Sequence, residues 1–91
     1  MDILYYVGGI KINSTIVALK VDERDDFAPN VQEILTSYGH NIKTRLGLHN
    51  HDQNQGLIIV EFLGSENDLN NFEEELKKVD LLNFKKMELN F

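Results

Sequence analysis

Residues 19–48 read LKVDERDDFAPNVQEILTSYGHNIKTRLGL, and this stretch decides the fold. It opens on the end of an alternating strand, passes through an acidic loop, and continues into a segment whose apolar residues recur at helical spacing. A second alternating segment follows directly. A strand, a helix and a strand in this order form half of a split β-α-β unit.

The strand expected over residues 14–22 carries apolar side chains on both of its faces. One face holds Val17, Leu19 and Val21, and the other holds Ile16, Ala18 and Lys20. A strand that is apolar on both sides is expected at the centre of a sheet or beneath a partner.

The helix is expected to begin near Asp26 and to end at Tyr38. Asp25 or Asp26 is a candidate N-cap, and Pro29 falls in the first turn, where its missing N–H is harmless. Gly39 is the expected left-handed C-cap. The apolar stripe of the helix consists of Phe27, Val31, Ile34, Leu35 and Tyr38.

A hairpin is expected next, because two alternating segments flank the polar residues 50–55. The first segment covers residues 42–49, and one of its faces holds Ile42, Thr44, Leu46 and Leu48. The second segment begins at Gly56, and one of its faces holds Ile58, Val60 and Phe62.

A second helix is expected after Ser65, because Ser65 and Asp68 have the spacing of a capping box. Its apolar stripe consists of Leu69, Phe72, Leu76 and Val79. The last strand is expected over residues 82–89. It loses strict alternation at Lys85 and Lys86, which predicts a bulge or a change of exposed face.

This order of elements predicts an α+β fold of the ferredoxin-like βαββαβ type, a four-stranded antiparallel sheet with two helices on one face. Residues 13–91 are expected to form this single domain, and residues 1–12 an N-terminal arm or an extra edge strand. The second face of the sheet would carry apolar residues without cover. We therefore expect a homo-oligomer, at least a dimer.

Composition limits the function classes. The chain has 91 residues, a net charge of -6 and no cysteine. The acidic balance argues against direct nucleic-acid binding, and no segment has the length and apolarity of a membrane span. A cytoplasmic location is expected. Because no constellation pairs a nucleophile with a base, we expect a protein that is not an enzyme.

Three functions of this fold lack the residues that they require. Metal chaperones need a pair of cysteines in the first loop, and the chain has none. RNA-recognition domains need aromatic residues on the central strands, where this chain has residues 57–61, LIIVE. Acylphosphatase-like enzymes need a phosphate-binding loop with an arginine after the first strand, and here that loop presents four carboxylates.

The chain resembles the ACT domain, a regulatory module with a ferredoxin-like fold. The resemblance rests on Val21 and Asp22, on Pro29, on the apolar pattern through Ile34 and Leu35, and on the run Gly39–Ile42. A narrower resemblance is to the iron-only hydrogenase system regulators, which are ACT-like and related to the C-terminal domain of nickel-responsive regulators. It covers roughly residues 15–89, through the segments VDERDDFAPNVQEIL, YGHNIKTRLGL, GLIIVEF and FKKMEL.

The resemblance implies a regulatory module that binds a small effector or a protein partner near the first strand-helix loop. The implied ligand-binding residues are Arg24, Asp25, Asp26 and Asn41. ACT domains that bind amino acids usually have a glycine directly after the loop proline, whereas this chain has Asn30. That departure argues against an amino acid as the effector.

The histidines suggest an alternative, a metal-responsive protein. His49 and His51 are two residues apart, and the nickel-responsive relatives bind metal with a His-x-His in a similar strand. A divalent transition metal is the only cofactor that the sequence suggests. The other interpretation is an exposed polar hairpin tip, because the cysteine ligand of those relatives is absent. His40 is expected to interact with the C-terminal dipole of the first helix.

The acidic residues of the first loop also have two interpretations. Asp22, Glu23, Asp25 and Asp26 could hold a hard cation, or they could cap the helix and face water. Arg24 would either hold an anionic effector or offset the negative charge of the loop.

Overall fold

The computed structural model describes residues 5–7, 10–22, 24–50 and 54–88, with side chains described from residue 13 on except at 24–25 and 49–50. The elements in chain order are β1 (Tyr5–Val7), β2 (Ile10–Val21), α1 (Arg24–Ser37), β3 (Ile42–Asn50), β4 (Gln55–Gly64), α2 (Glu66–Lys77) and β5 (Leu82–Glu88). In the described part of the chain, no helix is long and apolar enough to span a membrane.

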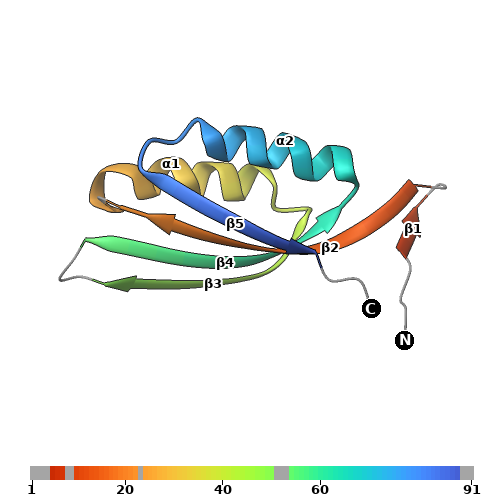
Figure 1. The fold of residues 1–91 in the computed structure, drawn as a ribbon, viewed down its shortest axis with the longest axis horizontal. Helices are drawn as coiled ribbons and strands as arrows, with labels where there is room; N and C mark the ends of the chain where they lie inside the picture. The colour runs from red at the N-terminus through yellow and green to blue at the C-terminus, as the bar shows by residue number, and fades with distance from the viewer. Residues whose placement is uncertain (1–4, 8–9, 23, 51–53, 89–91) are drawn as a thin grey trace.

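The sheet has the strand order β5-β2-β4-β3, and every neighbouring pair is antiparallel. Both helices lie on the same face, and the other face is uncovered (Figure 1). This arrangement confirms the predicted ferredoxin-like fold. β1 pairs with residues 10–12 of β2, beyond the part of β2 that pairs with β4 and β5. The expected division at residue 12 stays a prediction.

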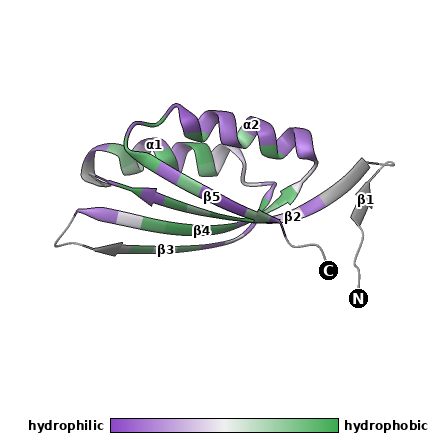
Figure 2. Ribbon diagram, viewed as in Figure 1, coloured by the Kyte–Doolittle hydropathy of each residue, from purple (hydrophilic) through white to green (hydrophobic). Residues whose placement is uncertain are grey.

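The core lies between the helices and the sheet. The strands contribute alternate residues, so that hydrophobic residues line the strands while hydrophilic residues dominate the helices (Figure 2). The fully buried side chains include Val17, Leu19, Val60, Phe62 and Phe72. The Phe62 and Phe72 rings stack with centroids 4.8 Å apart, which joins β4 to α2 at the centre of the domain.

The predicted extent of α1 is close to the observed one, because the Tyr38 N–H still donates to the Ile34 carbonyl (3.1 Å), but both predicted caps are wrong. α1 begins at Arg24, so Asp25 and Asp26 lie inside the helix and neither is the N-cap, and Pro29 lies in the second turn. Gly39 is not in the left-handed conformation. The helix ends in a tight turn instead, in which the Gly39 N–H donates to the Thr36 carbonyl (3.1 Å). A Cβ on Gly39 would lie 3.2 Å from that oxygen, so the turn still favours glycine.

The face predicted for residues 42–49 is also wrong at its first residue. β3 has a bulge between Ile42 and Thr44, and Lys43 is the extra residue. Ile42 therefore pairs with Phe62 and packs against the core, while Leu46 pairs with Ile59 on the opposite, uncovered face.

β5 has neither the bulge nor the change of face predicted at Lys85 and Lys86. Its register with β2 is regular, with Lys86 opposite Val17 on the helix side of the sheet. Lys86 Nζ lies 3.1 Å from Glu73 Oε1 on α2, and this ion pair explains a polar residue at a position that would otherwise be apolar.

The start of α2 confirms its prediction. The Asp68 N–H donates to Ser65 Oγ (3.1 Å), and the Ser65 N–H donates to Asp68 Oδ2 (3.2 Å). Lys77 and Lys78 at the other end pair with Glu74 and Glu75, at 3.2 and 3.1 Å.

Candidate functional site

Among the described residues, no helix or strand packs on the face of the sheet opposite α1 and α2, and we call it the open face. Its residues align across the strands in three rows. The Glu61 row is Met87, Ile16, Glu61 and Thr44. The central row is Lys85, Ala18, Ile59 and Leu46. The Lys20 row is Asn83, Lys20, Leu57 and Leu48.

Large apolar side chains on the open face are accessible to solvent. Leu46, Leu48 and Met87 are 55%, 54% and 58% exposed, and Leu57 and Ile59 are 38% and 36% exposed. Leu46, Leu48, Leu57 and Ile59 occupy neighbouring positions on β3 and β4 and form a contiguous patch. Met87 lies on β5, and the half-buried Ile16 and Ala18 of β2 connect it to that patch. Scattered exposed apolar residues are ordinary, but a contiguous apolar surface on a small domain marks an interaction site.

A carboxylate lies within this apolar surface. Glu61 is half-buried, and its Oε2 accepts a hydrogen bond from Ser14 Oγ (3.1 Å), while Thr44 Oγ1 lies 3.5 Å from Oε1. Lys20 and Lys85 are exposed on the same face. Among the residues that the structure describes, neither lysine has an ion-pair partner.

The predicted ligand-binding residues do not gather in one place within a chain. Arg24, Asp25 and Asp26 form the first turn of α1, and Asp26 is exposed. Asn41 follows the other end of the 14-residue helix, which is about 20 Å long at 1.5 Å per residue. Any site that uses all four residues would therefore require more than one chain.

Asn41 has a structural contact of its own. Its Nδ2 donates to the Leu63 carbonyl of β4 (3.1 Å), and the Leu63 N–H donates to the Asn41 carbonyl (2.7 Å). Gly64 lies against the same amide, because a Cβ there would be 2.9 Å from Asn41 Nδ2. Asn41 thus ties the turn after α1 to β4.

Of the four acidic residues in the first loop, the structure describes the side chains of Asp22 and Asp26. Asp22 is half-buried, and its Oδ1 accepts a hydrogen bond from Gln55 Nε2 (3.0 Å) at the start of β4. The Asp22 N–H donates to the Leu81 carbonyl (3.1 Å). These two bonds join the end of β2 to the hairpin and to the connection between α2 and β5.

The two histidines of the metal hypothesis, His49 and His51, lie outside the described side chains. The His49 backbone pairs with Gly56, near the end of β3, and His51 lies outside the described residues. Within the described residues, no group of three or more His, Cys, Asp or Glu could hold a metal ion. His40 is exposed in the turn after α1.

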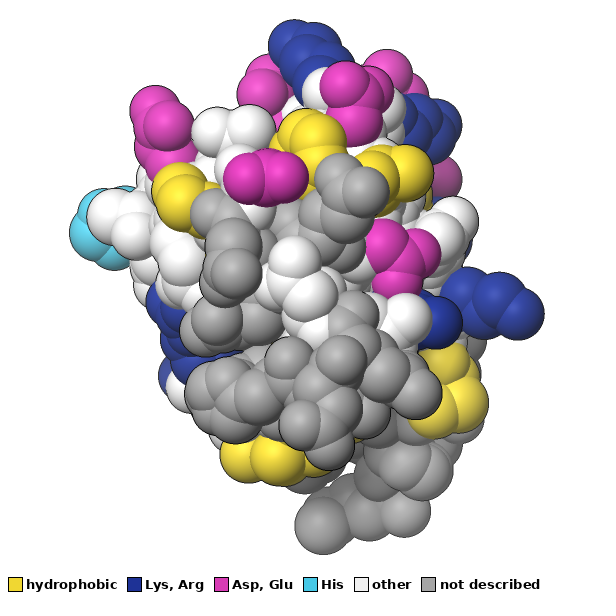
Figure 3. All heavy atoms as spheres, turned by 90° about the vertical axis from the view of Figure 1, so that its left-hand side faces the viewer, with side chains coloured by type: hydrophobic (Ala, Val, Ile, Leu, Met, Phe, Trp, Pro, Cys, Tyr) yellow, Lys and Arg dark blue, Asp and Glu magenta, His cyan; other side chains and the backbone are white. Residues whose placement is uncertain are grey.

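One end of the molecule brings together the start of α1, the β3–β4 hairpin and the connection from α2 to β5 (Figure 1). Figure 3 looks onto this end, where acidic and apolar side chains lie side by side around the helices. The predicted effector loop and the strand that carries His49 are both found here. Apart from Asn41, the residues of both hypotheses therefore belong to segments at the same end of the domain.

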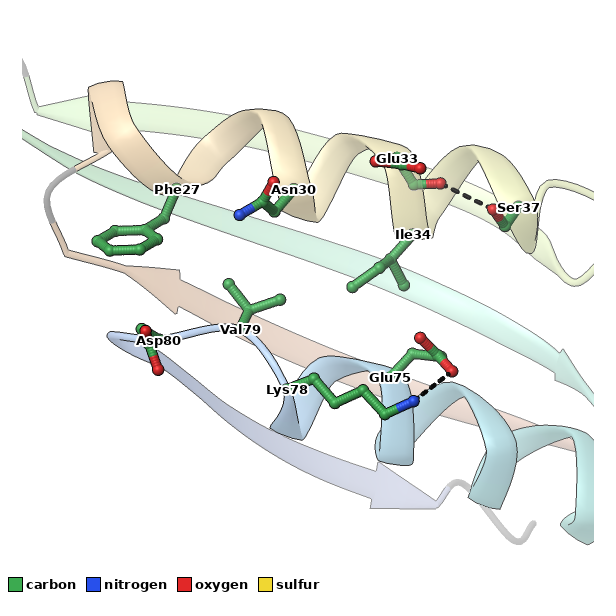
Figure 4. Close-up of a pocket in the computed structure, with 9 residues that line it drawn as sticks. All are labelled: Phe27, Asn30, Glu33, Ile34, Ser37, Glu75, Lys78, Val79 and Asp80. Atoms are coloured by element: carbon green, nitrogen blue, oxygen red, sulfur yellow. Dashed lines mark hydrogen bonds and ion pairs between the residues drawn. The ribbon is translucent and has the colours of Figure 1, made fainter.

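A groove between the two helices was not predicted from the sequence. It has a volume of about 360 Å³ and adjoins a second hollow of about 340 Å³ beside Tyr38. Phe27, Ile34 and Val79 reach into it, with the Lys78–Glu75 ion pair on one side (Figure 4). The Ser37 hydroxyl in its wall donates to the Glu33 backbone carbonyl (3.0 Å). The residues of its two walls are about 40 positions apart in sequence, so no local sequence pattern could predict the groove.

Comparison with known proteins supports the fold but does not establish a family or a function. No protein-family model matches the chain, and no curated protein matches it. Among solved structures, the chain is similar to an uncharacterized protein from Thermotoga maritima, with a TM-score of 0.81 and 18% sequence identity over 87% of this chain and 99% of that one.

A second similar structure is a formyltetrahydrofolate deformylase from Pseudomonas putida KT2440, with a TM-score of 0.58 and 11% identity. The match covers 82% of this chain but only 28% of the deformylase, so the same fold occurs there as one part of a longer protein. Both identities are low, and both comparisons therefore establish the fold alone. The chain is a ferredoxin-like α+β module, the shape that an ACT-like domain has.

Proposed function

We propose that this protein is a non-enzymatic ACT-like regulatory module that forms a homodimer through its open face. The observation that carries the proposal is the contiguous apolar surface of Leu46, Leu48, Leu57, Ile59 and Met87. Each Å² of apolar surface removed from water contributes about 25 cal/mol, so a second copy packed on this face would gain several kcal/mol before the entropic cost of association.

A second copy is the simplest occupant of the open face. Two sheets pack face to face with about 10 Å between them and with strand directions within about 30° of each other, and a twisted four-stranded face suits such a contact. The helices already cover the other side of the sheet. No further segment of the described chain reaches the open face, because β1 joins β2 beyond the paired region.

In the proposed regulatory role, a small effector or a protein partner binds at the end of the molecule where α1 begins. Arg24 and Asp26 belong to the first turn of α1 there, and Asp22 is held nearby by Gln55. Nothing at this end combines a nucleophile with a base among the described side chains, which favours binding over catalysis. Because the chain resembles the iron-only hydrogenase system regulators, we propose that the module regulates such a hydrogenase system.

Light scattering after size-exclusion chromatography tests the self-association. We expect the wild type to have twice the chain mass of 10.5 kDa and Leu46→Lys to have the mass of one chain. A charged residue in the apolar contact loses its hydration without gaining a partner. Asn70→Lys is the matched control, because Asn70 is exposed on α2, away from the sheet. A wild type that is monomeric at tens of micromolar contradicts the proposal.

A further inference from the structure

The charged residues of the open face are arranged so that the face is complementary to itself. Glu61 lies in one outer row, and Lys20 lies in the other outer row, on the far side of the central row. The two residues are on neighbouring strands, four positions apart in register. They are therefore about 13 Å apart along the strands and do not pair within a chain.

Two symmetric arrangements are available when two copies pack these faces with their strands aligned. In one arrangement the two-fold axis runs along the strands, and each row meets the same row of the other copy. The Glu61 carboxylates of the two copies then approach each other. In the other arrangement the axis runs across the strands through the central row, so each strand meets itself and each Glu61 row meets the Lys20 row of the other copy. Lys20 of the other copy then lies one strand, about 4.8 Å, to the side of Glu61, within reach of a lysine side chain.

Burial of Glu61 decides between the arrangements. A carboxylate enclosed in an apolar interface is costly unless a cation and hydrogen bonds compensate it. The Ser14 hydroxyl already donates to Glu61, at 3.1 Å, and Thr44 Oγ1 lies within 3.5 Å. Among the described residues of its own chain, no positive charge pairs with this carboxylate. Only the second arrangement supplies one, from Lys20 of the other copy.

Lys85 agrees with this geometry. It lies in the central row but on β5, at the edge of the sheet, and it is exposed. The symmetry brings the two copies of Lys85 toward each other only at the rim of the contact, where water and salt screen like charges. The middle of the contact is apolar, formed by Ala18 and Ile59 of both copies.

We propose that two copies pack their open faces with strands running in opposite directions, so that Glu61 of each copy pairs with Lys20 of the other. This inference rests on the proposed self-association and specifies its geometry. It also explains why Glu61 and Lys20 lie on either side of an apolar centre formed by Ala18 and Ile59. The pair favours one orientation and penalises the alternative in which carboxylates face each other.

Charge reversal tests the pairing in solution. We expect Glu61→Lys and Lys20→Glu, each alone, to weaken the homodimer by about 30-fold or more, because each places like charges together in a buried contact. An equal mixture of the two variants should form a heterodimer of near wild-type affinity, since both of its pairs then join opposite charges. Labelling one variant with ¹⁵N lets native mass spectrometry identify that heterodimer.

The outcomes separate the two proposals. Recovery in the mixture shows that both variants fold and that the two positions meet across the interface. If the wild type is dimeric and neither reversal changes its affinity, the pairing is wrong but self-association still holds. The same conclusion follows if the mixture does not regain the wild-type affinity. Glu61→Gln would relieve the repulsion between facing carboxylates, so tighter association of that variant points to the arrangement with facing carboxylates and overturns the pairing. A monomeric wild type overturns both proposals.

Discussion

Gly64 and Asn41 show how single residues fix the relation between the helices and the sheet. Gly64 ends β4 at the point where the Asn41 amide crosses to bond the Leu63 carbonyl, and it is buried. A Cβ on Gly64 would lie 2.9 Å from Asn41 Nδ2, 3.0 Å from Phe62 Cε1 and 3.2 Å from Asp68 Cβ. Glycine is required there by space.

Gly64→Ala should therefore destabilise the domain by about 1–3 kcal/mol, the usual cost of overpacking. Gly47→Ala is the matched control, because nothing lies within 4 Å of a Cβ at that exposed strand position. Alanine there should be neutral or slightly stabilising, since glycine weakens a strand. Urea unfolding followed by circular dichroism measures both free energies. Equal losses in the two variants would contradict the steric argument.

His49 and His51 are the residues on which the metal-responsive alternative depends. Equilibrium dialysis against Ni²⁺, Zn²⁺ and Co²⁺ tests it directly. The proposed function predicts no stoichiometric binding, and it predicts that His49→Ala with His51→Ala behaves as the wild type does. Metal bound by the wild type and lost in that double variant would instead establish the metal-responsive alternative, because imidazole is the preferred protein ligand of these ions.

Among the helices and strands, features that depend on neighbouring residues could be predicted from the sequence, whereas features that depend on pairing between distant strands could not. The capping box of Ser65 and Asp68 spans four residues, so the sequence displays it completely and the prediction was right. The bulge at Lys43 is different, because a lysine after an isoleucine carries no local sign of a bulge. It follows from pairing with β4, which is distant in sequence.

The bulge also determines the candidate site. Without it, Ile42 and Leu46 would share a face, as the alternation of residues 42–49 predicted. With it, Ile42 joins the core and Leu46 joins the open face. The existence of an uncovered apolar face could be predicted from β2 and β4 alone, but the contribution of β3 to it could not.

Ser65→Ala should cost about 1 kcal/mol of unfolding free energy, because it leaves the Asp68 N–H at the start of α2 without its side-chain acceptor. Asn67→Ala, at an exposed position in the first turn of the same helix, is the control and should change stability by less than about 0.5 kcal/mol. Thermal unfolding of both variants in parallel provides the comparison. A Ser65→Ala variant as stable as the control would show that the box does not stabilise the helix.

At the scale of the whole molecule, the fold completes a core on one side of the sheet and leaves the other side unfinished. The fully buried residues of β2 and β4 all lie on the helix side, while the alternate residues of the same strands meet solvent. A central strand with two apolar faces is costly to leave half-covered in water. The self-association that we propose would cover the second face of this strand.

The measurement that tests this account most directly compares exposed leucines in the wild-type protein by NMR, with a neutral nitroxide in solution as the relaxation agent. In a single chain, Leu46 and Leu48 on the open face are 55% and 54% exposed, and Leu81, off that face, is 48% exposed. The account predicts that the methyl groups of Leu46 and Leu48 relax several-fold less than those of Leu81, because a second copy covers them. Equal relaxation of all three at concentrations of tens of micromolar would show that the open face is bare, and would contradict the account.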